Sequence, residues 1–238
     1  MSILQALENA HRNEEKVVYV GSDYDGAFEN ICRDYLLELM EVIGIVGKFP
    51  KWVSLLWAGM SGEIVYGGIP QEPIEMSNGL TQGAPESAQL FNIACIPLNL
   101  VLENLKATPY VAGRIDNDHE ILEITKTNRL ITYSDDSQLG MKFTVENVIE
   151  YLNIVKEFTE VSGQKINEDK TQLIFSMTPS EEEIKQLENE GLRRDKFILP
   201  GQEVKILGHK FKVGTTLKNN SVLTLNSLKD WTSEKTKK

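Results

Sequence analysis

Residues 129–143 have the sequence Arg-Leu-Ile-Thr-Tyr-Ser-Asp-Asp-Ser-Gln-Leu-Gly-Met-Lys-Phe. The tetrapeptide Tyr133-Ser134-Asp135-Asp136 lies between two strand-like runs, 129–132 and 137–143, so the stretch predicts a β-hairpin with an acidic tip. Adjacent carboxylates repel each other and resist burial, and a divalent cation relieves both costs. The hairpin is therefore a candidate metal site.

A second acidic cluster, Asp23-Tyr24-Asp25, follows the apolar run 17–20. Two strands that end in carboxylates and meet in space form the layout of a two-metal phosphoryl-transfer site. Asp25 is the weaker candidate, because successive side chains of a strand point to opposite faces. Acid pairs are common in a chain with 35 Asp and Glu, and either cluster alone is more often a solvated turn.

The composition bounds the class of protein. With 238 residues the chain is long enough for one large domain or two small ones, and its net charge of −10 argues against a free-standing nucleic-acid binder. An acidic catalytic core whose basic contact surfaces lie in other domains remains compatible with that charge. No run reaches the roughly 18 apolar residues of a membrane helix, and two cysteines favour a reducing compartment, so we expect an intracellular protein without membrane contact.

Hydrophobic periodicity predicts long helices mixed with hairpins. The predicted helices are 2–12, 30–43, 49–60, 85–105, 145–161 and one that opens at Ser180, and the predicted β segments are 17–22, 63–76, 110–126, 129–132, 137–143, 170–175 and 204–213. This order favours an α+β fold with an antiparallel sheet over a doubly wound parallel fold.

Five segments in order resemble the motifs of reverse transcriptases. Residues 22–29 (Ser-Asp-Tyr-Asp-Gly-Ala-Phe-Glu) resemble motif A, residues 79–92 (beginning Gly-Leu-Thr-Gln-Gly) motif B, and residues 133–136 motif C. Residues 162–171 are similar to motif D of non-LTR retrotransposon and group II intron enzymes, and 206–209 to the primer-grip hairpin. Five motifs in order are far more specific than any one of them.

The resemblance implies a polymerase palm, an antiparallel sheet with helices packed on one face. It places the palm with motifs A–D in residues 1–200 and the primer-grip hairpin and tail in 201–238. Fingers and thumb are expected to be largely absent from this chain and to be supplied by another polypeptide.

The resemblance also implies catalytic roles. Asp23, Asp135 and Asp136 would hold two Mg²⁺ ions (or Mn²⁺) roughly 3.5–4 Å apart, with the carbonyl of Tyr24 as a further ligand. Lys170 matches the motif D lysine, a candidate general acid for pyrophosphate departure. An ordinary surface lysine is the alternative interpretation of Lys170.

Substrate contacts follow from motifs A and B. Phe28 would lie under the incoming sugar and exclude a 2′-hydroxyl, although an aromatic residue after a strand is more often part of a core. Gln82 and Gly83 would lie beside the nascent base pair, although Gly83 equally suits a turn before a helix. Leu207 and Gly208, followed by His209, would support the primer terminus, and an ordinary edge hairpin is the alternative.

The expected function is RNA-directed DNA synthesis on an RNA template, with dNTPs added to a DNA or RNA primer. Two alternatives stay open. Ser134 stands where reverse transcriptases usually have alanine and is familiar from viral RNA-dependent RNA polymerases. The acidic charge and the missing fingers suit a catalytically silent palm that acts as an RNA-binding or assembly scaffold.

Overall fold

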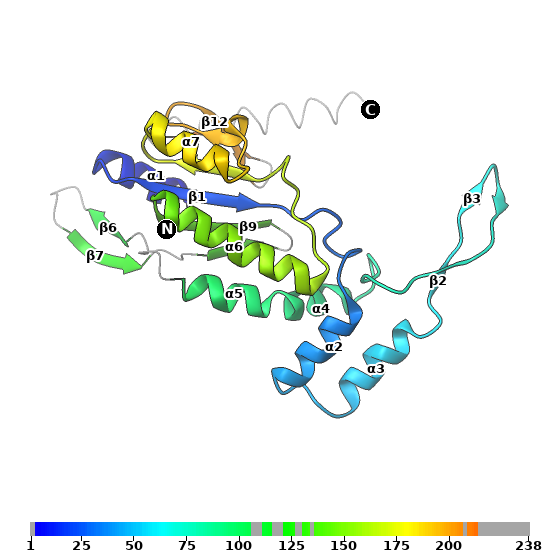
Figure 1. The fold of residues 1–238 in the computed structure, drawn as a ribbon. Coiled ribbons are helices and arrows are strands. Elements are labelled where there is room, and N and C mark those ends of the chain that lie inside the picture. The colour runs from blue at the N-terminus through cyan, green and yellow to red at the C-terminus, as the bar shows by residue number, and fades with distance from the viewer. Residues whose placement is uncertain are drawn as a thin grey trace, which may run out of the picture. The chain divides into compact units, whose positions relative to one another are not determined.

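The computed structural model of the protein describes residues 3–105, 111–115, 121–126, 130–133, 136–206 and 209–213. Its ribbon is shown in Figure 1. The chain divides into two compact units, each described here by itself. The sheet unit comprises Met1–Asp23, Leu102–Leu152 and Glu168–Lys238, and the helical unit comprises Tyr24–Val101 and Asn153–Asn167.

A five-stranded sheet forms the centre of the sheet unit. The strand order is β11-β10-β1-β9-β8, and every pairing is antiparallel except the parallel pair β10–β11. The strands are β1 (Val17–Ser22), β8 (Leu130–Tyr133), β9 (Asp136–Lys142), β10 (Gln172–Phe175) and β11 (Phe197–Ile198). The predicted α+β class with an antiparallel sheet is therefore confirmed.

The central strand β1 is held in register by a bulky residue opposite a small one. Tyr19 pairs with Gly140 of β9, and a Cβ atom at Gly140 would lie 2.6 Å from the Tyr19 ring. Only glycine therefore leaves space for this ring at that position. The apolar run 17–20 is fully buried, which explains why β1 has the bounds that its sequence predicts.

Different elements cover the two faces of the sheet. Tyr19 belongs to a buried cluster with α1 (Ile3–Arg12), which lies beside β1 in Figure 1, and with the hairpin β12 (Glu203–Ile206)–β13 (His209–Lys212). The other members are Ala6, Leu7, Ala10, Val17, Ile174, Val204 and Val213. Ser22 points to the opposite face, where its hydroxyl contacts the hydroxyl of Tyr151 from α6 (Val145–Ser162).

The helix α7 (Glu181–Asn189) begins with a complete capping box. The Ser180 hydroxyl accepts a hydrogen bond from the Glu183 N–H at 3.2 Å, and the Glu183 carboxylate accepts one from the Ser180 N–H at 2.7 Å. The same carboxylate pairs with Lys16, just before β1, at 2.8 Å. The sheet unit also contains the strand pair β6 (Val111–Ile115) and β7 (Ile121–Lys126) and the short helix η1 (Arg194–Lys196).

The helical unit contains α2 (Arg33–Val42), α3 (Lys48–Trp57), α4 (Ser87–Ala94) and most of α5 (Ile96–Glu103). Two short strand pairs follow α3, namely β2 (Ser61–Gly62) with β5 (Ile74–Glu75) and β3 (Val65–Tyr66) with β4 (Ile69–Pro70). Within this unit α2 contacts both α3 and α4.

Several predicted boundaries differ from the structure, and three of these differences concern the helix at 85–105, Asp136 and Lys170. The single helix predicted at 85–105 is divided at Cys95, because Pro97 has no N–H to donate to the carbonyl of Ile93 and its ring crowds that carbonyl. Asp136 is not at a hairpin tip but is the first residue of β9, where it pairs with Tyr133. Lys170 lies in a turn, and β10 begins two residues later.

Among the described helices, none combines the length and the apolar character that crossing a bilayer would require.

The Glu183 carboxylate should make stability depend on pH. Burial favours its neutral form, but hydrogen bonds from Lys16 and Ser180 outweigh burial and hold the pKa of Glu183 below its usual value. A depressed folded-state pKa stabilises the fold above the unfolded-state pKa, and this contribution is lost as the pH falls through the folded value. We expect Glu183→Gln to lower the free energy of unfolding by about 0.5–1 kcal/mol at pH 7 and by progressively less as the pH falls through the folded-state pKa of Glu183, measured by urea titration.

Glu182→Gln is the matched control, since it removes the same charge from the same helical turn without touching the Lys16 pair. An equal, pH-independent loss in both variants would contradict the assigned cause.

Candidate active site

Two of the predicted catalytic residues lie at the ends of adjacent strands, and both are at the same end of the sheet. Ser22, the last residue of β1, pairs with Ser137, the second residue of β9. Asp23 follows Ser22 and Asp136 precedes Ser137, so the two acids extend the same antiparallel ladder by one step. The structure thereby brings Asp23 and the backbone of Asp136 to the same end of neighbouring strands.

The predicted general acid reaches the same place from the other side of β1. Gly21 pairs with Gln172, the first residue of β10, and Lys170 lies in the turn just before that strand. The Nζ atom of Lys170 lies 2.6 Å from Oδ2 of Asp23. Asp23 is thus flanked by Asp136 on the β9 side and by Lys170 on the β10 side.

Burial is unequal within this ion pair. The Asp23 side chain is 13% exposed and its Oδ2 atom is buried, whereas the Lys170 side chain is 64% exposed. A buried carboxylate needs a compensating positive charge, because burial without one is costly. Lys170 supplies that charge from the solvent side.

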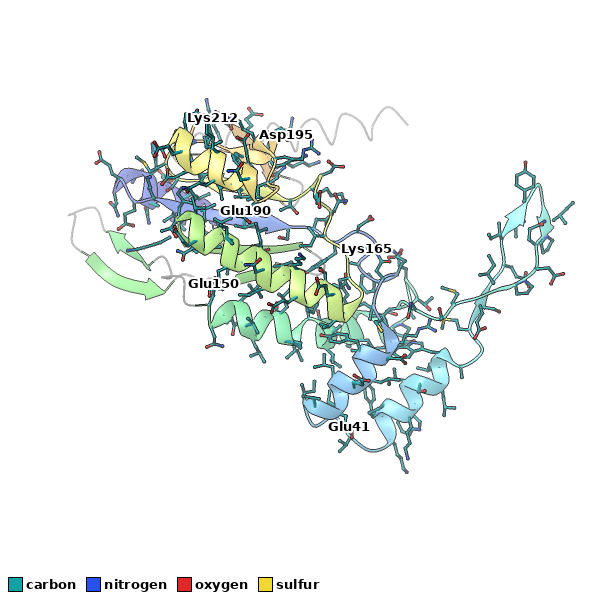
Figure 2. All side chains as sticks on the ribbon, in the orientation of Figure 1. Glu41, Glu150, Lys165, Glu190, Asp195 and Lys212 are labelled. Carbon is teal, nitrogen blue, oxygen red and sulfur yellow. The ribbon has the colours of Figure 1, made fainter. Side chains whose placement is uncertain are left out.

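The turn that carries Lys170 is fastened at its neighbour Asp169. Arg193 Nη1 lies 2.5 Å from Asp169 Oδ1, and Lys196 Nζ donates to the Asp169 carbonyl at 2.5 Å. Arg193 also forms an ion pair with Asp195, which Figure 2 labels, at 2.9 Å. These contacts are exposed and individually weak, but together they fix where the lysine side chain departs from the backbone.

The groups at this end of the sheet are of the chemical type that binds a divalent cation. Carboxylate oxygens are the ligands that Mg²⁺ prefers, and the buried Asp23 oxygen is one of them. Asp135 and the Asp136 side chain lie outside the described residues. Within the described part, no group of three or more His, Cys, Asp or Glu side chains is arranged to hold an ion.

The predicted carbonyl ligand is oriented by motif D. The N–H of Asp25 donates to the carbonyl of Lys165 at 2.8 Å, and Tyr24 pairs with Ile166 as an isolated antiparallel bridge. Because the peptide bond between Tyr24 and Asp25 is trans, the Tyr24 carbonyl points away from Lys165. Lys165, labelled in Figure 2, lies in the segment that follows α6.

The end of α6 also supports motif A within the helical unit. Gly163 adopts a φ of +76°, and a Cβ atom there would lie 2.6 Å from the carbonyl oxygen of Asn30. The Cys32 N–H donates to the Ser162 carbonyl at 2.8 Å, and Gln164 Nε2 donates to the Ala27 carbonyl at 2.7 Å. Motif D therefore acts as a backbone support for residues 24–32.

Motifs A and B lie side by side in the helical unit. The Leu80 N–H donates to the Phe28 carbonyl at 2.7 Å, and the Gly79 N–H donates to the Ile31 carbonyl at 2.9 Å. Gly79 has a φ of +83°, and a Cβ atom at this residue would lie 2.5 Å from the Glu29 carbonyl oxygen. The close approach of the two motifs thus requires glycine at position 79.

The predicted sugar gate rests on an aromatic neighbour. The Phe28 ring stacks on the ring of Phe91, a buried residue of α4, with centroids 5.0 Å apart and ring planes 28° from parallel. Phe28 itself is half-buried. One part of the ring therefore packs in a core, as the alternative interpretation of Phe28 expects, and the rest stays accessible.

The predicted base-pair contacts lie beside the end of motif A. Gln82 is exposed, and its amide donates to the Glu29 carboxylate. Gly83 has a φ of +85° with open space where a side chain would be. The Ser87 hydroxyl, at the start of α4, donates to the Thr81 carbonyl at 2.7 Å and so ties this loop to the helix.

Arg33 organises the approach to motif B and was not among the predicted residues. Its guanidinium donates to the Gly79 carbonyl at 2.9 Å and the Met76 carbonyl at 2.5 Å, and it lies 5.3 Å from the ring centre of Trp57. The side chain is buried, and burial lowers its pKa from the usual value. The helical period of 30–43 suggested only a polar position for Arg33, because its partners are remote in sequence.

The predicted primer grip is only partly described. β12 and β13 form an antiparallel pair in which Ile206 pairs with His209. Leu207 and Gly208 lie outside the described residues, so their role stays a prediction.

Comparison with known proteins identifies the family. A family profile described as "Reverse transcriptase (RNA-dependent DNA polymerase)" matches residues 1–211. The chain belongs to the reverse transcriptase family. Members of this family are RNA-directed DNA polymerases, and they generally use divalent metal ions.

The fold of this reverse transcriptase domain is similar to that of a solved telomerase. The structure of apo telomerase from Candida tropicalis, truncated from its C-terminal domain, matches with a TM-score of 0.52 over 87% of this chain at 10% sequence identity. The match covers 36% of the telomerase chain, so this chain spans about a third of that length. The predicted polymerase-palm fold is therefore confirmed, while the closer likeness to non-LTR and group II intron enzymes stays a prediction.

A Cβ atom at Gly79 should disrupt the contact between motifs A and B. Gly79→Ala and Gly83→Ala both place alanine at a positive φ, a strain of about 1–2 kcal/mol, but only the former also meets a backbone oxygen. We expect a loss in the free energy of unfolding of about 2–4 kcal/mol for Gly79→Ala and about 1–2 kcal/mol for Gly83→Ala, measured by urea titration. Equal losses in the two variants would show that the close approach of Gly79 to the Glu29 carbonyl does not contribute to stability.

Proposed function

We propose that this reverse transcriptase domain catalyses template-directed addition of dNTPs to a primer 3′-hydroxyl by two-metal phosphoryl transfer. The observation that carries the proposal is the strand register that sets Asp23 between the backbone of Asp136 and the ammonium group of Lys170. Acids and a cationic proton donor at one end of adjacent strands are the groups that such a transfer needs.

The bound ions would activate the primer hydroxyl and stabilise the leaving pyrophosphate. Asp23 and Asp135 would hold them, with Asp136 and the Tyr24 carbonyl in support. Lys170 would give a proton to the departing pyrophosphate as general acid.

Nucleotide selection would belong to the helical unit. Phe28, backed by Phe91, would exclude a ribose 2′-hydroxyl, while Gln82 and Gly83 would contact the nascent base pair. The amide of Gln82 is held by Glu29, which supports a defined position for that contact. Leu207 and Gly208 would support the primer terminus.

The proposed partners are an RNA template, a DNA or RNA primer and dNTPs, within a retroelement of the non-LTR type. A net charge of −10 supports the proposal that basic template contacts come from fingers and thumb segments supplied elsewhere. We propose an intracellular location.

Two alternative functions each have one feature in their favour. Ser134 favours a viral-type RNA-dependent RNA polymerase palm, and the acidic charge favours a catalytically silent scaffold. A viral-type RNA polymerase palm would prefer ribonucleotides with the unaltered chain. A silent scaffold would bind RNA without incorporating any nucleotide.

Loss of one motif C carboxylate should abolish synthesis. We expect Asp135→Asn to lower metal-dependent dNTP incorporation by the complete polymerase on a primed RNA template at least about a hundredfold, because a neutral amide holds the ion poorly. Asp25→Asn is the matched control, since it removes a neighbouring motif A carboxylate that lies outside the proposed site. Undiminished extension by Asp135→Asn would rule out the catalytic assignment.

Removal of the aromatic ring at position 28 should admit ribonucleotides. We expect Phe28→Val to reduce the preference for dNTPs over NTPs by about 10- to 200-fold in kcat/KM, since the stacked ring no longer fills the space of the 2′-hydroxyl. Phe28→Tyr keeps the ring and should keep the preference. An unchanged ratio in Phe28→Val would remove the gate role.

A further inference from the structure

We propose that Lys170 is an exchangeable counter-ion for Asp23, which a divalent metal ion must displace in order to bind. Its ammonium group lies 2.6 Å from Oδ2 of Asp23, one of the two carboxylate oxygens that could hold the proposed metal ion. The inference rests on the proposed function in one respect, namely that Asp23 is a metal ligand. It adds that metal loading and release of the lysine are one competitive event.

A divalent metal ion and the Lys170 ammonium group would repel each other if both were bound to Asp23. A magnesium–oxygen bond is about 2.1 Å long, so an ion on Oδ2 would lie at most about 4.7 Å from Nζ, even with the two cations on opposite sides of the oxygen. A dication and an ammonium group at that separation repel each other strongly. Binding of the ion therefore favours departure of the lysine.

The unequal burial decides which partner moves. Asp23 is 13% exposed and is fixed at the end of the central strand, so its carboxylate stays in place. Lys170 is 64% exposed, and its strongly hydrated ammonium group can return to water on a flexible stem. In an exchange of cations at this fixed carboxylate, the lysine side chain would therefore be the partner that moves.

The backbone at Lys170 can stay in place when the lysine side chain moves away from Asp23. Asp169 is held by Arg193 and Lys196, so the turn keeps its place while the lysine side chain swings. The displaced ammonium group would remain tethered near the reaction, where the proposed general acid is required. Metal loading would in this way also release the acid for its catalytic task.

The proposal predicts tighter metal binding when the lysine is removed. In the full chain without nucleic acid or nucleotide, we expect Lys170→Met to bind Mn²⁺ at its strongest site about two- to fivefold more tightly than the unaltered chain, measured from free Mn²⁺ by electron paramagnetic resonance. Lys170→Arg keeps a competing cation and should resemble the unaltered chain.

Lys142→Met is the matched control for a general charge effect. Lys142 is an exposed lysine of β9 that pairs with Val17, at the opposite end of β1 from Asp23. Its removal changes the net charge equally but leaves the competition at Asp23 intact. Equal Mn²⁺ affinities in Lys170→Met and Lys142→Met would overturn the proposal.

Asp23→Asn separates this inference from the proposed function. If Asp23→Asn binds Mn²⁺ as tightly as the unaltered chain, Asp23 is no ligand and the metal assignment itself fails. If Asp23→Asn weakens binding but Lys170→Met changes nothing, only the exchange fails.

A second measurement follows the lysine directly and does not depend on a charge-removing variant. The ¹³C signal of dimethylated Lys170, assigned by its loss in Lys170→Arg, should shift during a Mg²⁺ titration in step with binding. A signal that stays constant through saturation would overturn the exchange.

Discussion

The register of β1 between β9 and β10 is the constraint on which the rest of the site depends. Tyr19 fits only opposite Gly140, because a side chain at that position would overlap the ring. A slip by one residue would set the ring against Leu139 or Met141 and would also exchange the residues that β1 presents to the two faces of the sheet. The same register places Asp23 beside Asp136 and Lys170, so a packing requirement in the core of the sheet positions the chemistry at its end.

Local patterns in the sequence predicted the elements whose stability is local. β1 has the predicted bounds Val17–Ser22, α6 ends just before Gly163, which has a positive φ, and α7 begins directly after the capping residue Ser180. The candidate site residues came from motif resemblance, and for Asp23 and Lys170 the structure adds a contact between residues far apart in sequence. The contact between Asp23 and Lys170 could be recognised only once the antiparallel pairing of β1 with β10 was known.

The role of Arg33 could not be predicted from the sequence, because its hydrogen-bond partners lie far away in the chain. Arg33 is buried against the carbonyls of Met76 and Gly79, more than 40 residues further along, and no helical period reports such a bond. A buried guanidinium is tolerated only because each contact satisfies a donor, so Arg33 ties the position of motif B to that of α2. The division of the predicted helix at Cys95 was visible in principle through Pro97, but a kink and a break have the same local signature.

The chain passes from the sheet unit to the helical unit within motif A, between Asp23 and Tyr24. The proposed metal ligand Asp23 therefore depends on the packing of β1, whereas the proposed sugar gate Phe28 depends on Phe91 and the core of the helical unit. On the proposed roles, substitutions in the core around α4 would alter nucleotide preference, whereas the position of Asp23 would depend on the strand register of the sheet unit.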